Sequence, residues 1–274
     1  MTLRLGWFTS ARGPGSRAMY EAVAGAIAAG EFEARFAFVF CNRDPGEDEI
    51  TDRFLELVRA NDHPLITRSS VRYRRSIGGD RSRPGEDLPA WRVEYDRLVD
   101  SDLAEQPFDL GVLAGYMLIF TGEFVRRHPL LNLHPALPDG PSGTWREVIH
   151  TLIRKRAAES GVMLHLAIAE VDTGPVVAYS RYPLRGPRLD ALWSEIESEI
   201  EMLDDKALEA SALFAAIRQE AVRYEAPLLL ATVAEFATGR LRIAGGRVMG
   251  AGGEQRTTAD LSDQVRERVR AGGD

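Results

Sequence analysis

Three polar side chains lie near the ends of apolar runs of this chain. Side chains of these types can stabilise an oxyanion and transfer a proton. Asn132 and His134 close the run 130–134, and Asp172 follows the run 162–169. An amide N–H can donate to an oxyanion at any pH, and a protonated imidazole adds a charged donor. A carboxylate can orient the imidazole or a water molecule and accept a proton. Since alternate residues of an extended segment face the same side, we expect Asn132 and His134 to point together.

The elements that must position these side chains follow a strand and helix alternation. Short apolar runs without helical period predict strands, and the segments between them carry helical patterns. Such alternation favours a parallel sheet with right-handed crossovers. The sequence therefore predicts an α/β fold, a mostly parallel twisted sheet flanked by helices. The predicted strands are 3–8, 36–41, 64–66, 110–114 and 130–133, and the first predicted helices are 17–29 and 48–60.

Two short motifs carry a family resemblance. They are Asn132-Leu133-His134-Pro135 and Asp172-Thr173-Gly174-Pro175. With the supporting stretches 91–98, 108–117 and 236–241, the chain resembles the folate-dependent formyltransferases, and within them the branch that acts on glycinamide ribonucleotide. The resemblance implies a formyltransferase-like (Rossmann-like) fold, 10-formyltetrahydrofolate as co-substrate and no metal. It also implies a catalytic trio of Asn132, His134 and Asp172. Taken singly, each of the three has an alternative as an ordinary loop or turn residue.

The resemblance implies a substrate side as well. It places the substrate phosphate on the first loop, at Gly13, Gly15, Ser16 and Arg17, where glycines and a helix N-terminus suit an anion. This loop is about two residues longer than is usual in the family, and Arg17 replaces an asparagine, so a plain turn stays open. Glu225 matches a family glutamate on the substrate amine side, and a solvated helix face is its alternative.

The co-substrate side is implied by two further segments. One of them departs from the family pattern, because Leu118 stands where an arginine is usual. The loop after Pro135 is also shortened, so the surface that faces the substrate is not standard. The residues that the resemblance assigns to co-substrate binding are Tyr116, Met117, Leu118, Val171, Thr173 and Gly174.

Residues 67–89 interrupt the alternation with six arginines among Ser and Gly. We interpret them as a mobile loop or lid that either clamps an anionic group or carries solvated surface charge. A long helical region is predicted over 189–219, and its glutamates, at alternate positions 195 to 201, indicate a solvated face. A second helical segment covers 221–237, and Gly245-Gly246 predicts a hairpin between 240–244 and 247–250. The expected organisation is a catalytic domain at 1–186, a helical elaboration with the hairpin at 187–253, and a flexible tail at 254–274.

Composition sets limits on partners. The formal net charge of −7 argues against broad contact with a phosphate backbone, and therefore against nucleic acid as a partner. The single cysteine, Cys41, excludes an intrachain disulfide and reads as a buried strand thiol. The chain lacks an apolar run of membrane-spanning length and a charged-then-apolar leader, so we expect a cytoplasmic protein without a membrane partner. The expected partners are a small amine and a folate, and a homodimer is left open.

The sequence thus predicts an enzyme that moves a formyl group from 10-formyltetrahydrofolate to a primary amine. Asn132 and His134 would stabilise the oxyanion and Asp172 would manage the proton. Glycinamide ribonucleotide, and with it purine biosynthesis, is the leading candidate for the acceptor. Three alternatives stay open: a 10-formyltetrahydrofolate hydrolase, a transferase for another amine such as an amino sugar, and a non-catalytic folate or nucleotide binding module.

Overall fold

The chain divides into two units whose segments interleave along the sequence. The computed structural model describes residues 2–82, 86–256 and 258–272. The first unit takes residues from 1–132, 166–174 and 234–254, and the second takes residues from 133–165, 175–233 and 255–274. These units do not follow the boundaries 186 and 253 expected from the sequence, because the chain passes several times from one unit to the other.

The first unit contains a parallel sheet. Its strand order is β5-β4-β1-β2-β3, and every neighbouring pair within it is parallel. The order reverses between β1 and β4, which makes the carboxyl ends of these two strands a topological switch point. The predicted α/β fold with a mostly parallel sheet is confirmed. The strands are β1 (Leu3–Thr9), β2 (Ala34–Cys41), β3 (Leu65–Thr67), β4 (Leu110–Leu113) and β5 (Leu130–His134), whose last two residues belong to the second unit.

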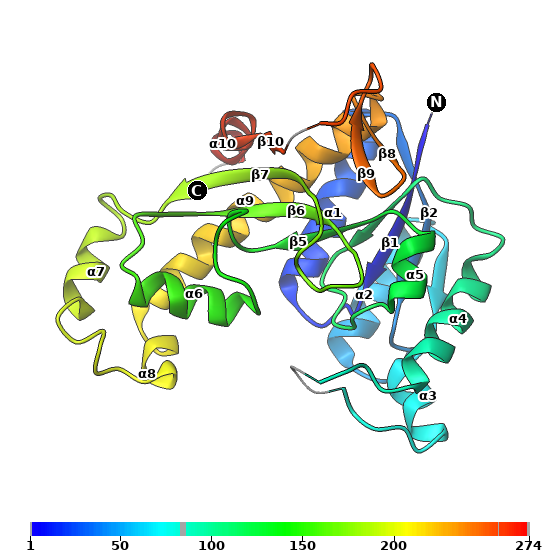
Figure 1. Ribbon diagram of the computed structural model, residues 1–274, viewed down its shortest axis with the longest axis horizontal. Helices are drawn as coiled ribbons and strands as arrows, with labels where there is room; N and C mark the ends of the chain where they lie inside the picture. The colour runs from blue at the N-terminus through cyan, green and yellow to red at the C-terminus, as the bar shows by residue number, and fades with distance from the viewer. Residues whose placement is uncertain (1, 83–85, 257, 273–274) are drawn as a thin grey trace. The chain divides into compact units, whose positions relative to one another are not determined.

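Helices cover both faces of this sheet (Figure 1). On one face, Tyr20 packs edge-on against Trp7 of β1 and Phe54 packs against Tyr20. On the other face, Phe8 packs against a cluster that includes Tyr95 and Phe124. The hairpin predicted at Gly245-Gly246 is present, and both glycines have positive φ. The elements are α1 (Pro14–Ala28), α2 (Glu49–Ala60), α3 (Ser70–Ser76), α4 (Trp91–Leu103), α5 (Gly122–Arg127), β8 (Leu241–Ala244) and β9 (Arg247–Gly250).

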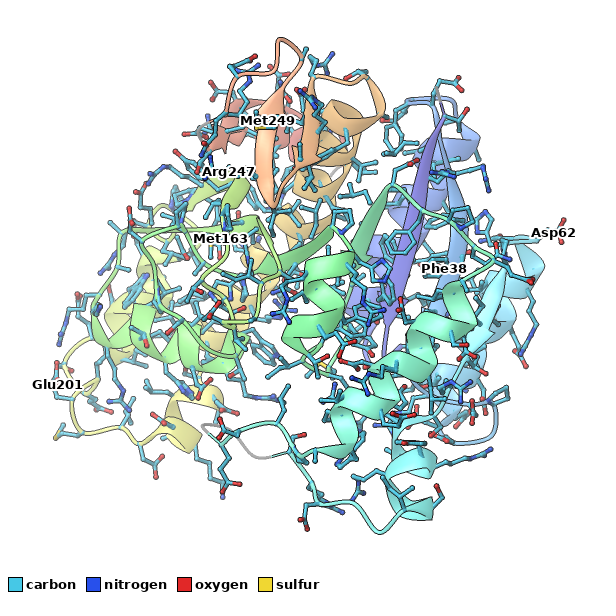
Figure 2. The ribbon with its side chains drawn as sticks, turned by 45° about the vertical axis from the view of Figure 1, so that its right-hand side comes forward. Phe38, Asp62, Met163, Glu201, Arg247 and Met249 are labelled. Atoms are coloured by element: carbon cyan, nitrogen blue, oxygen red, sulfur yellow. The ribbon has the colours of Figure 1, made fainter. Side chains whose placement is uncertain are left out.

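A bulge in β2 decides which aromatic side chains meet on each face. Leu5 pairs with Phe36 and Gly6 with Phe38, so Ala37 is the extra residue on β2. A bulge shifts the alternation of side chains by one position. Phe36 therefore packs against Trp7 on one face, whereas Phe38, labelled in Figure 2, packs against Phe8 on the other.

The Arg-rich stretch is partly helical, which corrects its interpretation as a mobile loop. Ser69 caps α3 by accepting from the backbone N–H of Arg72. Arg68 donates two hydrogen bonds to Asp102, and Arg72 lies 3.0 Å from Glu47. These arginines are thus occupied by carboxylates of the chain itself. Arg83 lies outside the described residues.

The second unit contains an antiparallel pair with one added parallel strand. β6 (Glu159–Leu166) pairs with β7 (Val176–Pro183), and β10 (Ala259–Asp260) pairs with β7. The helical region predicted over 189–219 is broken into α7, α8 and the start of α9. The segment expected to be a tail forms β10 and α10, in which Val265 is fully buried; residues 257, 273 and 274 lie outside the description. The helices are α6 (Trp145–Arg154), α7 (Asp190–Ile196), α8 (Asp205–Glu209), α9 (Ala212–Ala237) and α10 (Ser262–Ala271).

Within residues 2–82, 86–256 and 258–272, no helix combines the length and the apolar character that a membrane span needs.

Candidate active site

The two motifs found in the sequence meet in the first unit. Asn132 Nδ2 donates a hydrogen bond of 3.3 Å to Asp172 Oδ1, although forty residues separate them in the chain. Asn132 lies near the carboxyl end of β5, and the segment with Asp172 is tied to the start of this strand by the N–H of Ala167, which donates to Leu130 O. An amide donor and a carboxylate acceptor are therefore held side by side at the end of a parallel strand, where α/β folds place their ligands.

Asp172 has a special backbone conformation. Its φ is +58°, in the left-handed region that Asp and Asn tolerate better than other non-glycine residues. Thr173 follows it in the turn and donates its hydroxyl to Glu170 O at 3.1 Å. The side chains of Val171 and Thr173 are exposed, and Asp172 is half-buried. The turn thus fixes the direction of the carboxylate while leaving it in reach of a ligand.

His134 belongs to the second unit and is almost fully buried. Its Nε2 lies 3.0 Å from Pro141 O, and a carbonyl can only accept, so Nε2 donates in this contact. The ring of His165 lies 6.5 Å from the ring of His134, at an interplanar angle of 73°. The N–H on Nε2 is therefore held by the loop that follows Pro135, and this N–H would have to leave Pro141 before it could serve a substrate.

The first loop is built differently from its prediction. α1 begins at Pro14, so Gly15, Ser16 and Arg17 lie in its first turn and Gly13 is its N-cap. The N–H groups of a first turn lack partners within the helix and can bind an anion, although Pro14 removes one of them. Ser16 donates its hydroxyl to Gly13 O at 2.9 Å, and Arg17 pairs with Glu21 at 3.0 Å on the helix surface. Both side chains are thus occupied by the chain itself.

The first loop meets the predicted co-substrate segment at the switch point of the sheet. Ser10 N–H donates to Gly115 O at 3.1 Å, and Met117 N–H donates to Ser10 Oγ at 2.9 Å. Gly115 has a φ of +67°, and a methyl group there would lie 2.9 Å from Ser16 Cβ. Close packing of two backbones, one after β1 and one after β4, therefore requires this glycine.

Two of the predicted co-substrate residues expose large apolar side chains. Met117 and Val171 are 72% and 52% exposed, although such side chains are usually buried. Ile119, which was not predicted, is 44% exposed in the same segment as Met117. A Cβ added at Gly122 would lie 3.0 Å from Ala169 Cβ, so the segments that follow β4 and precede Asp172 approach each other. Tyr116 lies differently, because it stacks on Phe120 and its hydroxyl is buried. Leu118 is half-buried, and Gly174 is buried at the end of the Asp172 turn.

Glu225 does not lie on a solvated helix face, which corrects that alternative. Its side chain is 6% exposed and accepts a hydrogen bond of 2.6 Å from Arg218, one of whose faces lies over the ring of Trp145. Glu225 and Arg218 are seven residues apart, two turns of α9. A guanidinium of the chain itself thus neutralises the carboxylate that the resemblance assigns to the substrate amine.

Sequence reasoning missed the groups that hold these segments. Pro141 and Arg218 carry no motif of their own, and no role was predicted for Arg92 and Asp96, although both lie in the stretch 91–98 that supports the family resemblance. The last two stand four residues apart on α4, and this spacing is a signal for neighbours on one helix face. It cannot tell a buried face from a surface one.

Two further titratable groups have shifted pKa values because they are removed from water. Cys41 ends β2 fully buried, and burial raises the pKa of its thiol to about 12. Burial also lowers the pKa of His63, whose Nδ1 lies 2.7 Å from the Tyr20 hydroxyl. Among the residues that the structure describes, His, Cys, Asp and Glu side chains nowhere gather in threes as a metal ion would require. The glutamates at alternate positions 195 to 201 are exposed, and Figure 2 labels Glu201.

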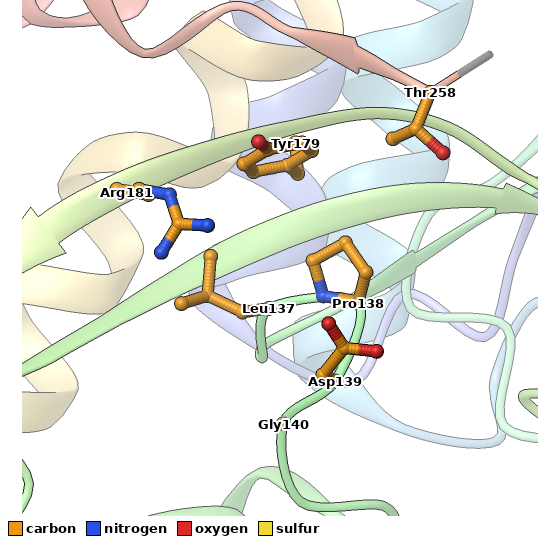
Figure 3. Close-up of a pocket in the computed structure, with 7 residues that line it drawn as sticks. All are labelled: Leu137, Pro138, Asp139, Gly140, Tyr179, Arg181 and Thr258. Carbon is orange, nitrogen blue, oxygen red and sulfur yellow. The ribbon is translucent and has the colours of Figure 1, made fainter.

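The loop after Pro135 lines a hollow of about 420 Å³ within the second unit (Figure 3). Its polar groups have partners in the chain: Arg181 pairs with Glu159 at 2.6 Å, and Tyr179 donates to Asp260 at 3.0 Å. Thr258 donates to Val176 O. The hollow therefore offers few free donors to a ligand. Its lining is Leu137, Pro138, Asp139, Gly140, Tyr179, Arg181 and Thr258.

A family model described as formyl transferase matches residues 15–188, more than half of the chain. The chain belongs to the formyl transferase family. The matched residues include both motifs and the segments around Gly115 and Ser16. The family resemblance predicted from the sequence is thereby confirmed.

Curated relatives match shorter segments. A phosphoribosylglycinamide formyltransferase from Dictyostelium discoideum is 36% identical over 85 residues, which cover 28% of this chain and 41% of that protein. For the relatives compared, the matched share of the relative ranges from 7% to 51% of its length.

Solved structures with the same fold carry two different names. A phosphoribosylglycinamide formyltransferase from Coxiella burnetii aligns with a TM-score of 0.64 at 18% identity, over 95% of this chain and 100% of that one. A formyltetrahydrofolate deformylase from Burkholderia mallei aligns with a TM-score of 0.62 at 14% identity, over 91% of this chain and 70% of that one. At these identities the likeness supports the fold alone.

Proposed function

We propose that this chain transfers a formyl group from 10-formyltetrahydrofolate to a primary amine of a small phosphorylated molecule. Glycinamide ribonucleotide is the leading acceptor, by analogy with the phosphoribosylglycinamide formyltransferases among its relatives. The observation that carries the proposal is the hydrogen bond of 3.3 Å between Asn132 and Asp172, which joins the two motifs within a member of the formyl transferase family.

The proposed reaction is direct attack. The amine nitrogen forms a bond to the formyl carbon, and the carbonyl oxygen becomes an oxyanion that accepts hydrogen bonds from Asn132 Nδ2 and from the His134 imidazole. Asp172 takes the proton that the amine loses, directly or through water. The bond between the formyl carbon and the folate nitrogen then breaks, and that nitrogen gains a proton. A covalent enzyme intermediate is not needed.

The binding roles follow from exposure and backbone geometry. Met117, Ile119 and Val171 offer apolar surface for the flat rings of a folate, and Tyr116 and Leu118 support this surface from within the same segment. Thr173 and Gly174 shape the turn around Asp172. The first-turn N–H groups of Gly15, Ser16 and Arg17, beside Gly13, would hold a phosphate. Folate would act as a co-substrate, with no metal in the reaction.

Hydrolysis of the formyl group is the second candidate. One observation favours it, namely that Arg218 already neutralises Glu225, so this carboxylate is less able to receive an amine than the resemblance implies. Water in place of the amine would use the same trio. A transferase for another amine, such as an amino sugar, fits the same observation.

The test is mass spectrometry of the reaction products. The chain is mixed with 10-formyltetrahydrofolate and glycinamide ribonucleotide, and a second reaction lacks the acceptor. Asp172→Asn is the informative variant because Asn tolerates the same left-handed backbone, so the charge is lost without added strain. Glu170→Gln, an exposed carboxylate two residues earlier, is the matched control.

We expect a formylated acceptor from the wild type and from Glu170→Gln, and a loss of at least about 100-fold in kcat/KM for Asp172→Asn. Deformylation at equal rates with and without acceptor would favour the hydrolase. An unmodified folate in every reaction would contradict both proposals.

A further inference from the structure

Three basic side chains lie along one side of α6 and face two carboxylates of α8. Arg146, His150 and Arg154 follow one another at intervals of four residues, so they share one side of the helix. Asp205 and Glu209 have the same spacing on α8, which lies beside α6 in the second unit (Figure 1). His150 is the middle member of the basic row.

The two arginines pair with the carboxylates at the surface. Arg146 Nε lies 3.3 Å from Glu209 Oε2, and Arg154 Nη2 lies 2.7 Å from Asp205 Oδ1. The hydrogen bond from Arg154 lowers the pKa of Asp205, which favours its ionised form. Arg146 and Asp205 are 55% and 66% exposed, and exposed pairs of this kind contribute little to stability. Because a guanidinium does not lose its proton in proteins, these pairs stay charged between about pH 5 and 8.

His150 lies in the buried centre of this contact. Its side chain is 11% exposed, and its ring lies 5.4 Å from the ring of Phe214 on α9. Nδ1 lies 3.8 Å from Asp205 Oδ2, and Nε2 lies 3.5 Å from Glu209 Oε1. Neither approach is a hydrogen bond, so the energy of the contact depends on the charge of the ring. The charged neighbours of the ring are Arg146, Glu147 and Arg154 on α6 and Asp205 and Glu209 on α8.

A carboxylate near each ring nitrogen distinguishes the two charge states of an imidazole. The neutral ring has one N–H and one lone pair, so one of the two carboxylates would face a lone pair. The imidazolium presents an N–H to both carboxylates and carries a charge opposite to theirs. Histidine is also the side chain that ordinarily changes its charge between about pH 5 and 8.

We propose that His150 is a pH-dependent latch, which holds α8 on α6 when its ring is protonated and loosens segment 197–211 when its ring is neutral. The segment contains α8 and the connection from α7, and Met202 within it is 78% exposed. Once the proton is lost, the segment is held by the exposed arginine pairs and by Leu208, which is fully buried. Because the closed arrangement places two carboxylates at the ring, falling pH favours closure. The latch goes beyond the proposed reaction, since none of the catalytic trio takes part in it.

Hydrogen exchange read by mass spectrometry tests the latch at about pH 5.5 and about pH 8. Rates for peptides that cover 197–211 are divided by those of an unfolded reference at the same pH, because amide exchange itself depends on pH. His150→Gln keeps a polar side chain that cannot take up a proton, and Glu209→Gln removes one carboxylate while the ring stays in place. His128→Gln is the matched control, because His128 Nε2 also lies near a carboxylate, at 2.6 Å from Asp100 Oδ1, but in the first unit.

We expect the corrected exchange of 197–211 in the wild type to be at least about threefold faster at the higher pH. His150→Gln should exchange at the faster rate at both pH values, Glu209→Gln should show less than about a twofold difference, and His128→Gln should behave like the wild type. Equal corrected rates at the two pH values in the wild type would overturn the proposal. A response that survives in His150→Gln or Glu209→Gln, or that His128→Gln also removes, would overturn it as well.

Discussion

Two buried carboxylates, one in each unit, each have an arginine partner but direct their hydrogen bonds in different ways. The side chains of Asp96 and Glu225 are 2% and 6% exposed, and each has an arginine on its own helix. Asp96 directs its short bond to a backbone N–H and keeps Arg92 at 3.7 Å, whereas Glu225 receives Arg218 directly at 2.6 Å. The first pair therefore hydrogen-bonds to the backbone of another segment, at Ile119 and Thr121. In the second pair, the two side chains bond mainly to each other.

The difference shows that burial and charge do not by themselves assign a role to a residue. A carboxylate bound to its own arginine has little left to offer a substrate. A carboxylate that accepts a hydrogen bond from a backbone N–H helps to fix the position of a loop. The group that bonds to the carboxylate therefore distinguishes the two cases, and it also predicts how each pair responds to substitution.

The largest effect is expected for Arg92→Met alone. This variant leaves Asp96 buried without a compensating charge, so the free energy of unfolding should fall by about 3–5 kcal/mol. Urea unfolding followed by circular dichroism would measure it. Asp96→Asn added to Arg92→Met should restore much of the loss, and a loss that persists in the double variant would mean that packing, not charge, carries the effect.

Gly115→Ala should have the next largest effect, and it tests the backbone that the first pair serves. A φ of +67° and a contact of 2.9 Å with Ser16 Cβ both oppose a methyl group. The expected loss of unfolding free energy is about 1–3 kcal/mol, with weaker binding of both substrates because the first loop and 116–121 meet there. Gly30→Ala, which has a φ of +71° but open space around it, is the control for conformation without the clash.

Glu225→Gln tests the second pair. Because Arg218 already neutralises the carboxylate, the acceptor KM should change by less than about threefold, and unfolding free energy should fall by about 1–2 kcal/mol. Arg218 is 27% exposed, so its charge can regain water once the carboxylate is gone. A rise of tenfold or more in acceptor KM would restore Glu225 to the substrate side.

The smallest effect belongs to an exposed pair that serves as a reference. The Arg4 hydrogen bond lowers the pKa of Asp109 below its usual 3.8. A carboxyl whose pKa is lower in the folded state stabilises the fold above the unfolded pKa, and this gain is lost as pH falls below about 4. Asp109→Asn should therefore cost under about 1 kcal/mol at pH 7 and nothing at low pH, as measured by urea unfolding across that range.

Asp96 should show the opposite sign. Burial raises its pKa, although Thr121 and Arg92 oppose this shift. A carboxyl whose pKa is higher in the folded state contributes most at low pH, and its contribution falls as pH rises from 3.8 through the folded pKa. As pH rises, the difference in unfolding free energy between the wild type and Asp96→Asn should therefore shrink. The difference between the wild type and Asp109→Asn should grow.

The parallel unit was largely predictable because its strands are short apolar runs between helical patterns. Such local signals indicated β1, β2, β3, β4, β5 and the hairpin of β8 and β9 within a few residues. The start of α1 was misjudged because Pro14 reads as a loop residue, although proline suits the first turn of a helix. The break between α7 and α8 was missed because its residues are good helix formers.

The candidate site was predictable only where a motif names it. The structure brings Asn132 and Asp172 together, two residues that the family resemblance had placed in one trio. The partners of His134 and Glu225, which are Pro141 and Arg218, depend on tertiary contacts that no periodicity reveals. The interpretation of the Arg-rich stretch as a mobile loop was wrong for the same reason, since Arg68 and Arg72 pair with carboxylates on other segments.

The single thiol provides a built-in report on how often the parallel sheet opens. Cys41 is fully buried at the end of β2, and its raised pKa keeps it protonated, while only the exposed thiolate reacts with an alkylating reagent. Labelling of the native chain must therefore wait for β2 to detach from its neighbours. The rate at which Cys41 is alkylated therefore measures the opening of this strand, and no further cysteine or label has to be introduced.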